Sequence, residues 1–127
     1  MADITGSWLG TYWQSKAPTR FEATLAQAKG SLSGRILDDS PLGEASLQGE
    51  VTGRQVSFVK RYLNNASYTV RYTGTISEDG NHMSGQWVVN ARTTGNWEAQ
   101  RNQNDLAQEL KSFLAKTAPA ELAGAAK

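Results

Sequence analysis

Lys60 is the residue of this sequence with the greatest capacity for chemistry, because its charged side chain is predicted to face the same way as apolar ones. Phe58, Lys60 and Tyr62 alternate with polar residues, so a β-strand here would point all three side chains the same way. Burying an unpaired ammonium costs free energy. Four roles are open: an ammonium that reaches water at a rim, a counter-charge for a ligand carboxylate, a desolvated nucleophilic amine, or an ion pair with Asp38 or Glu44.

Aromatic side chains accompany Lys60 on the inward face of the predicted strands. Buried phenols normally need hydrogen-bond partners, and small-molecule pockets combine apolar walls with a few convergent polar groups. These side chains are therefore candidates for holding a ligand. The candidate ligand-binding residues are Tyr12, Phe21, Ile36, Lys60, Tyr62, Tyr68, Trp87 and Trp97.

Catalytic, metal and cofactor sites are not indicated by the remaining residues. The chain has no Cys and one His, which excludes thiol chemistry, disulfides and a multi-histidine metal centre. His82 stands alone and is expected at the surface. Asp38 and Asp39 fall in a predicted turn, where consecutive acidic residues are usually solvated. We expect no metal, no cofactor and no catalytic residue.

Charge and hydropathy limit the kinds of partner that the protein can bind. The 13 basic and 12 acidic residues leave no electrostatic footprint for nucleic acid. No apolar run approaches the roughly 20 residues of a membrane span, and the N-terminus lacks the charged-then-apolar order of a signal peptide. We expect a cytoplasmic protein without a nucleic-acid or membrane partner.

The candidate side chains need a scaffold, and period-two alternation predicts one. Eight short segments are each half apolar and half polar: 4–12, 20–27, 32–37, 44–52, 54–62, 67–76, 82–90 and 94–100. No gap is long enough for a crossover helix, so neighbouring strands should be antiparallel. Such strands close most economically into a barrel without free edges, a two-sheet sandwich being the alternative. The predicted fold class is all-β, an eight-stranded antiparallel up-and-down β-barrel with a C-terminal α-helix.

The predicted domain organisation follows from a change of pattern near the end of the chain. Residues 1–101 form the predicted barrel. Apolar residues then recur at helical spacing, which predicts a helix over residues 102–117 packed on the barrel. The Ala-rich residues 118–127 are expected to form a flexible tail.

Glycine recurs at matched positions in five of the predicted strands. The pattern apolar–polar–Gly–polar–apolar covers residues 4–8, 32–36, 47–51, 72–76 and 83–87, with glycine on the inward face. Glycine within a strand costs roughly 0.5–1 kcal/mol relative to alanine, so the repetition indicates a geometric need. Either the glycines let the strands coil at the corners of a small barrel, or the missing side chains leave internal room for a ligand.

Two of these motifs carry a resemblance to a known family. Residues 4–8 read Ile-Thr-Gly-Ser-Trp and residues 83–87 read Met-Ser-Gly-Gln-Trp, a rhythm that resembles the calycin superfamily. Avidin-like barrels are the nearest in rhythm, and lipocalins and fatty-acid-binding proteins are looser relatives. The resemblance covers about residues 3–101 and implies an eight-stranded barrel that holds a small molecule at one mouth. Gly10 and Ile36 stand where avidins carry Asn and Tyr, so the resemblance lacks the biotin-specific polar residues.

The direction of the strands sorts the connections into two ends. The longer predicted connections, 14–19, 38–43, 63–66 and 90–93, fall at one end together with the phenols and Lys60. The inward residues near the other end are all apolar and predict a packed plug. The end with the longer connections is therefore the predicted ligand mouth.

The sequence thus predicts a small-molecule binding protein that holds an apolar or aromatic ligand in the open mouth of a β-barrel. An acidic group on that ligand is left open. Two alternatives stay open: a cofactor-free barrel enzyme of the isomerase or cyclase type, and a protein-interaction module with no ligand. Binding is preferred to catalysis. Several apolar residues fall on the outward face, which leaves a homo-oligomer open: Leu9, Trp13, Leu37, Val59 and Val88.

Overall fold

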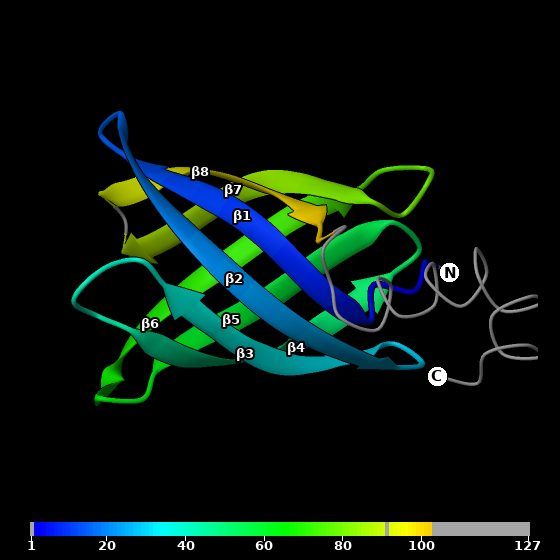
Figure 1. Cartoon of the computed structure of the whole chain (residues 1–127), viewed down its shortest axis with the longest axis horizontal. Coiled ribbons are helices and arrows are strands. Elements are labelled where there is room, and N and C mark those ends of the chain that lie inside the picture. The colour runs from blue at the N-terminus through cyan, green and yellow to red at the C-terminus, as the bar shows by residue number, and fades with distance from the viewer. Residues whose placement is uncertain (1, 91, 103–127) are drawn as a thin grey trace, which may run out of the picture.

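The structure is a computed structural model that describes residues 2–90 and 92–102. Within these residues eight strands follow one another: β1 (Gly6–Gln14), β2 (Ala17–Ala28), β3 (Ser31–Asp38), β4 (Glu44–Thr52), β5 (Gln55–Tyr62), β6 (Asn65–Ile76), β7 (His82–Asn90) and β8 (Thr93–Arg101). Each strand pairs antiparallel with the next, and β1 also pairs with β8, so the sheet closes into a barrel (Figure 1). The predicted eight-stranded barrel is confirmed, and the sandwich is excluded.

Other parts of the prediction fall at or beyond the last strand. The expected helix over residues 102–117 and the tail over 118–127 lie outside the described residues, except for Asn102. The backbone N–H of Asn102 donates to the carbonyl of Ser7 at 2.8 Å, which continues the contact between β8 and β1. None of the described residues belongs to a helix long and apolar enough to cross a membrane.

Side chains alternate between the interior of the barrel and its outside, as the period-two pattern predicts. In β3, for example, Leu32 and Ile36 are buried, whereas Ser33 and Arg35 are exposed. The predicted apolar plug is confirmed at the end away from Lys60, where eight inward side chains are at most 5% exposed: Ile4, Leu25, Leu32, Val51, Val56, Ile76, Met83 and Ala99.

The prediction that the longer connections gather at one end is wrong. The strands run further than their alternation indicated, so residues 15–16 alone join β1 to β2 and residues 63–64 alone join β5 to β6. Ser15 and Lys16 have φ angles of 49° and 73°, the left-handed conformation that tight hairpin turns require. We call the end where β1, β3, β5 and β7 finish the Asp38 end, after the residue that closes β3.

The inward glycines lie where neighbouring strands and large rings approach closely. A Cβ atom on Gly85 would stand 1.9 Å from the carbonyl oxygen of Thr73, and one on Gly49 would stand 2.0 Å from that of Ser57. A Cβ on Gly95 would meet the Trp87 ring at 2.6 Å. The space at these positions is filled by backbone and aromatic rings. The glycines therefore serve close packing, and the alternative that they leave room for a ligand is wrong there.

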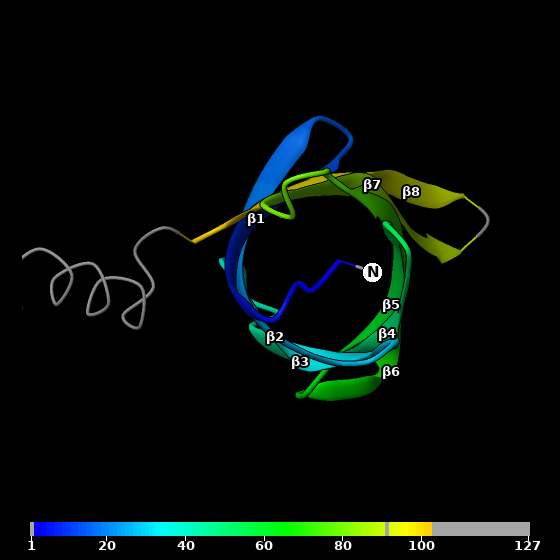
Figure 2. The same ribbon diagram turned by 90° about the vertical axis from the view of Figure 1, so that its right-hand side faces the viewer.

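The N-terminal segment, residues 2–5, closes the end opposite the Asp38 end. Figure 2 shows this segment running across the end of the barrel. Ile4 is fully buried, and its backbone N–H donates to Gln27 Oε1 at 3.0 Å. The carbonyl of Ile4 accepts the indole N–H of Trp8 at 2.9 Å. Buried polar atoms of the segment are thus satisfied, so it can stay inside an apolar end.

Arg101, the last residue of β8, holds this segment in place. Its guanidinium lies 4.7 Å from the centre of the Trp8 ring. It also donates to the carbonyls of Asp3 at 3.1 Å, Thr5 at 2.8 Å and Gly80 at 3.0 Å. A single charged side chain therefore ties the start of the chain, the first strand and the β6–β7 turn together.

Candidate functional site

Lys60 lies inside the barrel as part of an ion pair with Asp38. Its side chain is 1% exposed, and its Nζ lies 2.7 Å from Asp38 Oδ1 and 2.8 Å from Oδ2. The two residues come from β5 and β3, which are separated by β4, so the pair spans the interior. Of the roles open to Lys60, pairing with Asp38 is the one observed. Glu44 instead forms an exposed pair with Arg35.

The expectation that Asp38 is a solvated turn residue is wrong. Asp38 is 4% exposed, whereas its neighbour Asp39 is exposed as expected. Asp38 closes β3 two residues after the buried Ile36, so the alternation of the strand turns its side chain inward. The signal was present in the sequence: an inward lysine that needs a partner, and an acidic residue in the inward phase of another strand.

Two phenols complete the set of groups around this carboxylate. The hydroxyl of Tyr62 donates to Asp38 Oδ2 at 2.5 Å, and the hydroxyl of Tyr12 donates to the same oxygen at 3.1 Å. The Lys60 Nζ also lies 4.8 Å from the centre of each of these two rings. We call Tyr12, Asp38, Lys60 and Tyr62 the Asp38 cluster. Every polar group in it is hydrogen-bonded, as burial requires.

Burial shifts the acid–base behaviour of the cluster. Burial lowers the pKa of Lys60, and the charge of Asp38 opposes that shift. Burial raises the pKa of Tyr12 and of Tyr62, and the nearby Asp38 carboxylate raises both further. Both phenols therefore keep their protons at neutral pH and act as hydrogen-bond donors to the carboxylate.

A half-buried aromatic rim covers the cluster at the Asp38 end. Tyr12 and Tyr68 are both partly buried and packed against the core, as are Leu42 and Val89. The Tyr68 ring meets the Tyr62 ring edge-on, with 5.2 Å between their centres. Solvent therefore reaches Tyr12 and Tyr68 at this end, while the pair of Asp38 and Lys60 stays buried.

The structure brings most of the predicted site residues together. Tyr12, Lys60 and Tyr62 belong to the cluster, and Tyr68 contacts it. Phe21 stacks on Tyr12 with 6.4 Å between ring centres, and the Trp87 ring meets Tyr12 edge-on at 6.2 Å. Six of the eight predicted residues thus lie in or against the Asp38 cluster.

Two predicted residues have other surroundings. Ile36 is 2% exposed within the apolar core. Trp97 packs against Phe58 and Tyr72, with ring centres 5.8 Å and 5.5 Å away, and its indole N–H donates to the carbonyl of Thr73 at 3.0 Å. Trp97 therefore belongs to a packed aromatic layer of the interior.

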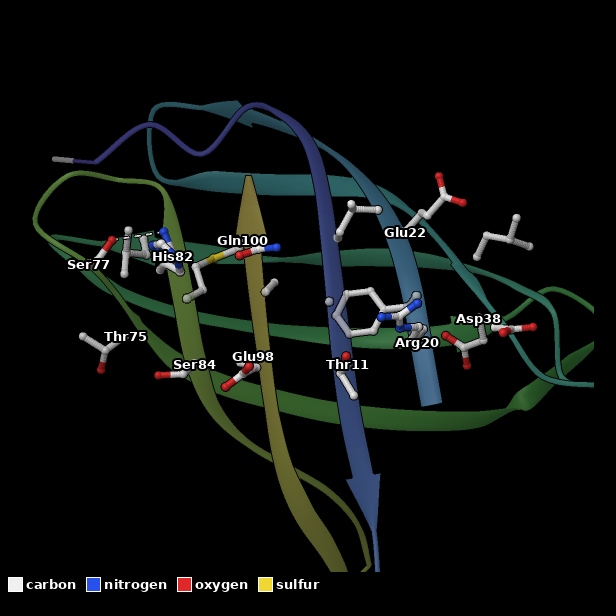
Figure 3. Close-up of a pocket in the computed structure, with 18 of the residues that line it drawn as sticks. Thr11, Arg20, Glu22, Asp38, Thr75, Ser77, His82, Ser84, Glu98 and Gln100 are labelled. Carbon is white, nitrogen blue, oxygen red and sulfur yellow. Dashed lines mark hydrogen bonds between the residues drawn. The ribbon is translucent and has the colours of Figure 1, made fainter. Parts of the chain in front are cut away.

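An open groove of about 890 Å³ lies along the outer face of the barrel, lined by residues of β1, β2, β3, β6, β7 and β8 that include Phe21 and Asp38. Figure 3 shows Arg20 and Glu22 on β2 and Glu98 on β8 around it. These side chains are exposed and carry both signs of charge, and Leu37 adds an apolar side chain that is 53% exposed. Among the described residues, no three His, Cys, Asp or Glu side chains gather as ligands for a metal ion.

Comparison with known proteins identifies the fold. No protein-family model and no curated protein matches the chain. The redesigned β-barrel mFAP1 bound to DFHBI has a TM-score of 0.60 and 9% identity, over 78% of this chain and 94% of that one. A fluorescence-activating β-barrel designed de novo has a TM-score of 0.61 and 16% identity, over 80% of this chain and 100% of that one.

A third similar structure is EF1p2_mFAP2b bound to DFHBI. Its TM-score is 0.53 and its identity 11%, over 78% of this chain and 94% of that chain. At such low identities the likeness concerns the path of the backbone. The chain shares with these proteins an all-β, closed, eight-stranded antiparallel up-and-down barrel.

Proposed function

We propose that this barrel binds a small, largely apolar or aromatic molecule at the Asp38 end, against Tyr12 and Tyr68. The observation that carries the proposal is the Asp38–Lys60 pair, buried beneath a half-exposed aromatic rim. A buried ion pair is not by itself a source of stability, since apolar residues of similar volume often do as well. The opposite end of the same barrel is closed by apolar packing, so polar groups are not required to fill the interior.

The energy of such binding would come mainly from apolar burial, at roughly 25 cal/mol per Å². Stacking on Tyr12 and Tyr68 would orient an aromatic ring. Two of the barrels that resemble this one in fold are bound to DFHBI, itself a small aromatic molecule, and this supports the choice of ligand class.

Finer assignments belong to the same proposal. We propose that the barrel is calycin-like, of the avidin-like or lipocalin-like kind, on the basis of its motifs at residues 4–8 and 83–87. A cytoplasmic location and a homo-oligomer stay predictions. Leu37 and Val88 are the outward apolar residues with exposed side chains, at 53% and 37%, that an oligomer would cover. A cofactor-free enzyme and an interaction module remain the alternatives.

An NMR titration tests the proposed site. Indole, 2-naphthol and DFHBI are added separately to the labelled protein, and backbone shifts are followed. We expect saturable shifts at Tyr12 and Tyr68, weakened by Tyr68→Ala. Leu63→Ala is the matched control, because Leu63 lies in the β5–β6 turn at the same end with its side chain 50% exposed. Shifts confined to the outer groove, around Thr11 and Glu98, would refute the proposed site.

A further inference from the structure

The outward side chains of the groove lie in rows that follow the pairing of the strands. Leu9 of β1 pairs with Gln100 of β8 and with Glu22 of β2, and Glu22 pairs in turn with Leu37 of β3. Figure 3 shows Gln100 and Glu22 on the two sides of β1. Leu9 is half-buried and Leu37 is exposed. The outer face thus carries two apolar side chains two strands apart, about 9.6 Å at a strand spacing of about 4.8 Å.

The described part of the chain ends beside this apolar half of the groove. On the other side of β8, the outward lining residues of β6 and β7 are polar and exposed: Thr75, His82 and Ser84. The backbone N–H of Asn102 donates to the carbonyl of Ser7 on β1, at 2.8 Å. The chain therefore continues from a point next to β1, on the side where Leu9 and Leu37 lie.

The sequence that follows Asn102 has a stripe that matches the row in length. Four apolar residues recur there at helical spacing: Leu106, Leu110, Phe113 and Leu114. In a helix, with a rise of about 1.5 Å per residue, Leu106 and Phe113 would lie about 10.5 Å apart, close to the separation of Leu9 and Leu37. A helix of about 15 residues is marginal by itself in water, so its stripe needs an apolar surface.

Charges of both signs are present on the barrel and on the segment. Arg20 and Glu22 of β2 are exposed, and neither forms an ion pair with another described residue. In a helix, Glu109 and Lys111 would flank the apolar stripe on its two sides. Docking over β2 therefore provides both barrel charges with a counter-charge.

We propose that residues 103–117 dock as an amphipathic helix on the outer face of the barrel, across β1, β2 and β3, where they cover Leu9 and Leu37. The segment is attached at Asn102, and a short tether holds it at an effective concentration of the order of millimolar. It therefore occupies the groove in preference to a second copy of the chain. This inference does not depend on a ligand at the Asp38 end.

Paramagnetic broadening in NMR spectra of the full chain tests the docking. The chain has no cysteine, so Ser112→Cys creates a single attachment site for a nitroxide. In a helix this position lies opposite the apolar stripe, so the label stays out of the contact. We expect the amide signals of Leu9, Glu22 and Leu37 to lose most of their intensity relative to the reduced label. Val59 should keep its intensity, because β5 lies across the barrel from β1.

Two further changes in the labelled protein locate the contact. Phe113→Ser should restore the groove signals, because it removes the largest side chain of the stripe. Gln108→Ser is the matched control on the opposite side of the helix, and it should leave the broadening unchanged. Leu37→Ser should also weaken the broadening, and the barrel interior stays intact because the Leu37 side chain is 53% exposed.

The remaining outcomes assign the groove to another occupant or to none. Protein carrying ¹⁵N is mixed with nitroxide-labelled protein without ¹⁵N, and equal broadening of the groove signals in this mixture would assign the groove to a second copy. Groove signals that ignore the nitroxide and shift with added indole would assign it to a small molecule. Either result, no broadening, or even broadening over the whole barrel would overturn the proposal.

Discussion

Asp38 and Lys60 meet inside the barrel from strands that do not touch each other, with both carboxylate oxygens within 2.8 Å of the ammonium. The pair links β3 to β5 past β4. Each charge is tolerated in the interior only because the other is there.

Lys60→Met should therefore destabilise the protein by about 3–5 kcal/mol, because it leaves a buried carboxylate without its counter-charge. Replacing both residues, with Asp38→Leu and Lys60→Met together, should recover most of that loss. Urea denaturation followed by circular dichroism measures both variants.

The matched control for that experiment is Arg35→Met, which breaks an ion pair whose side chains are 61% and 46% exposed. Its cost should stay below about 1 kcal/mol. Equal costs for Arg35→Met and Lys60→Met would contradict the importance assigned to the buried pair.

Stability should fall at alkaline pH because phenols inside the barrel hold their protons. Burial raises the pKa of Tyr12, Tyr62 and Tyr72 above the ordinary value of 10.0. The unfolded chain loses these protons near pH 10 and the folded chain keeps them. Their contribution is thus complete below pH 10 and declines above it, by up to about 1.4 kcal/mol per pH unit for each fully protected phenol.

Lys60 changes the free energy of unfolding in the opposite direction, because its pKa is lowered from 10.5 and the folded chain loses that proton first. This contribution stops growing once the unfolded chain has also lost the proton. Ionisation of the buried tyrosines, read by absorbance at 295 nm, should lag behind that of ordinary tyrosines and should coincide with unfolding. Tyr72→Phe should make the decline shallower. Reversible titration of all tyrosines near pH 10 with the fold intact would refute this prediction.

Gly85→Ala should destabilise the barrel by at least about 1–3 kcal/mol, the range of overpacked interiors, because the added Cβ would stand 1.9 Å from the Thr73 oxygen. Gly30→Ala is the control: its nearest contact would be 3.3 Å, from the carbonyl of Val51. Thermal unfolding of the two variants compares them, and a Gly85→Ala protein as stable as the parent would show that the strands can separate at little cost.

Arg101→Met should loosen the N-terminal segment while leaving the barrel folded. The change removes donors to the carbonyls of Asp3, Thr5 and Gly80, bonds from a charged group that are each worth about 1.5–3 kcal/mol at most. Faster hydrogen exchange at the amide of Ile4 is the expected signature.

Arg54→Met is the control for that exchange experiment. Arg54 is an exposed arginine at the same end whose described side-chain bond is a single one of 3.4 Å to the carbonyl of Ile76. Unchanged exchange at Ile4 in the Arg101→Met protein would mean that apolar packing alone holds the segment.

The sequence predicted which way side chains face better than how far strands run. Period-two alternation turned Lys60 and Tyr62 inward correctly, because strand geometry leaves two directions only. The same rule applied through Ile36 places Asp38 inward, yet the composition of residues 38–41 resembles a turn and masked it. Asp38 ends β3 with its side chain inward, and the turn begins at Asp39.

The alternation pattern does not predict at which height along the barrel axis an inward side chain lies. The stagger between paired strands decides which inward rings share a level, and alternation within one strand carries no such information. Trp97 was therefore grouped with the mouth residues, although it packs with Phe58 and Tyr72. Similarly, Ser15 and Lys16 adopt the left-handed conformation although neither is a glycine. The sequence therefore predicts a longer first connection than the two-residue turn that the structure has.

The closure formed by residues 2–5 and Arg101 restricts the proposed binding to one route. Because that end is shut, a ligand of the proposed kind would enter and leave past Tyr12 and Tyr68 alone. Substitutions at the closed end should therefore change the stability of the barrel and leave the rates of ligand association and dissociation unchanged.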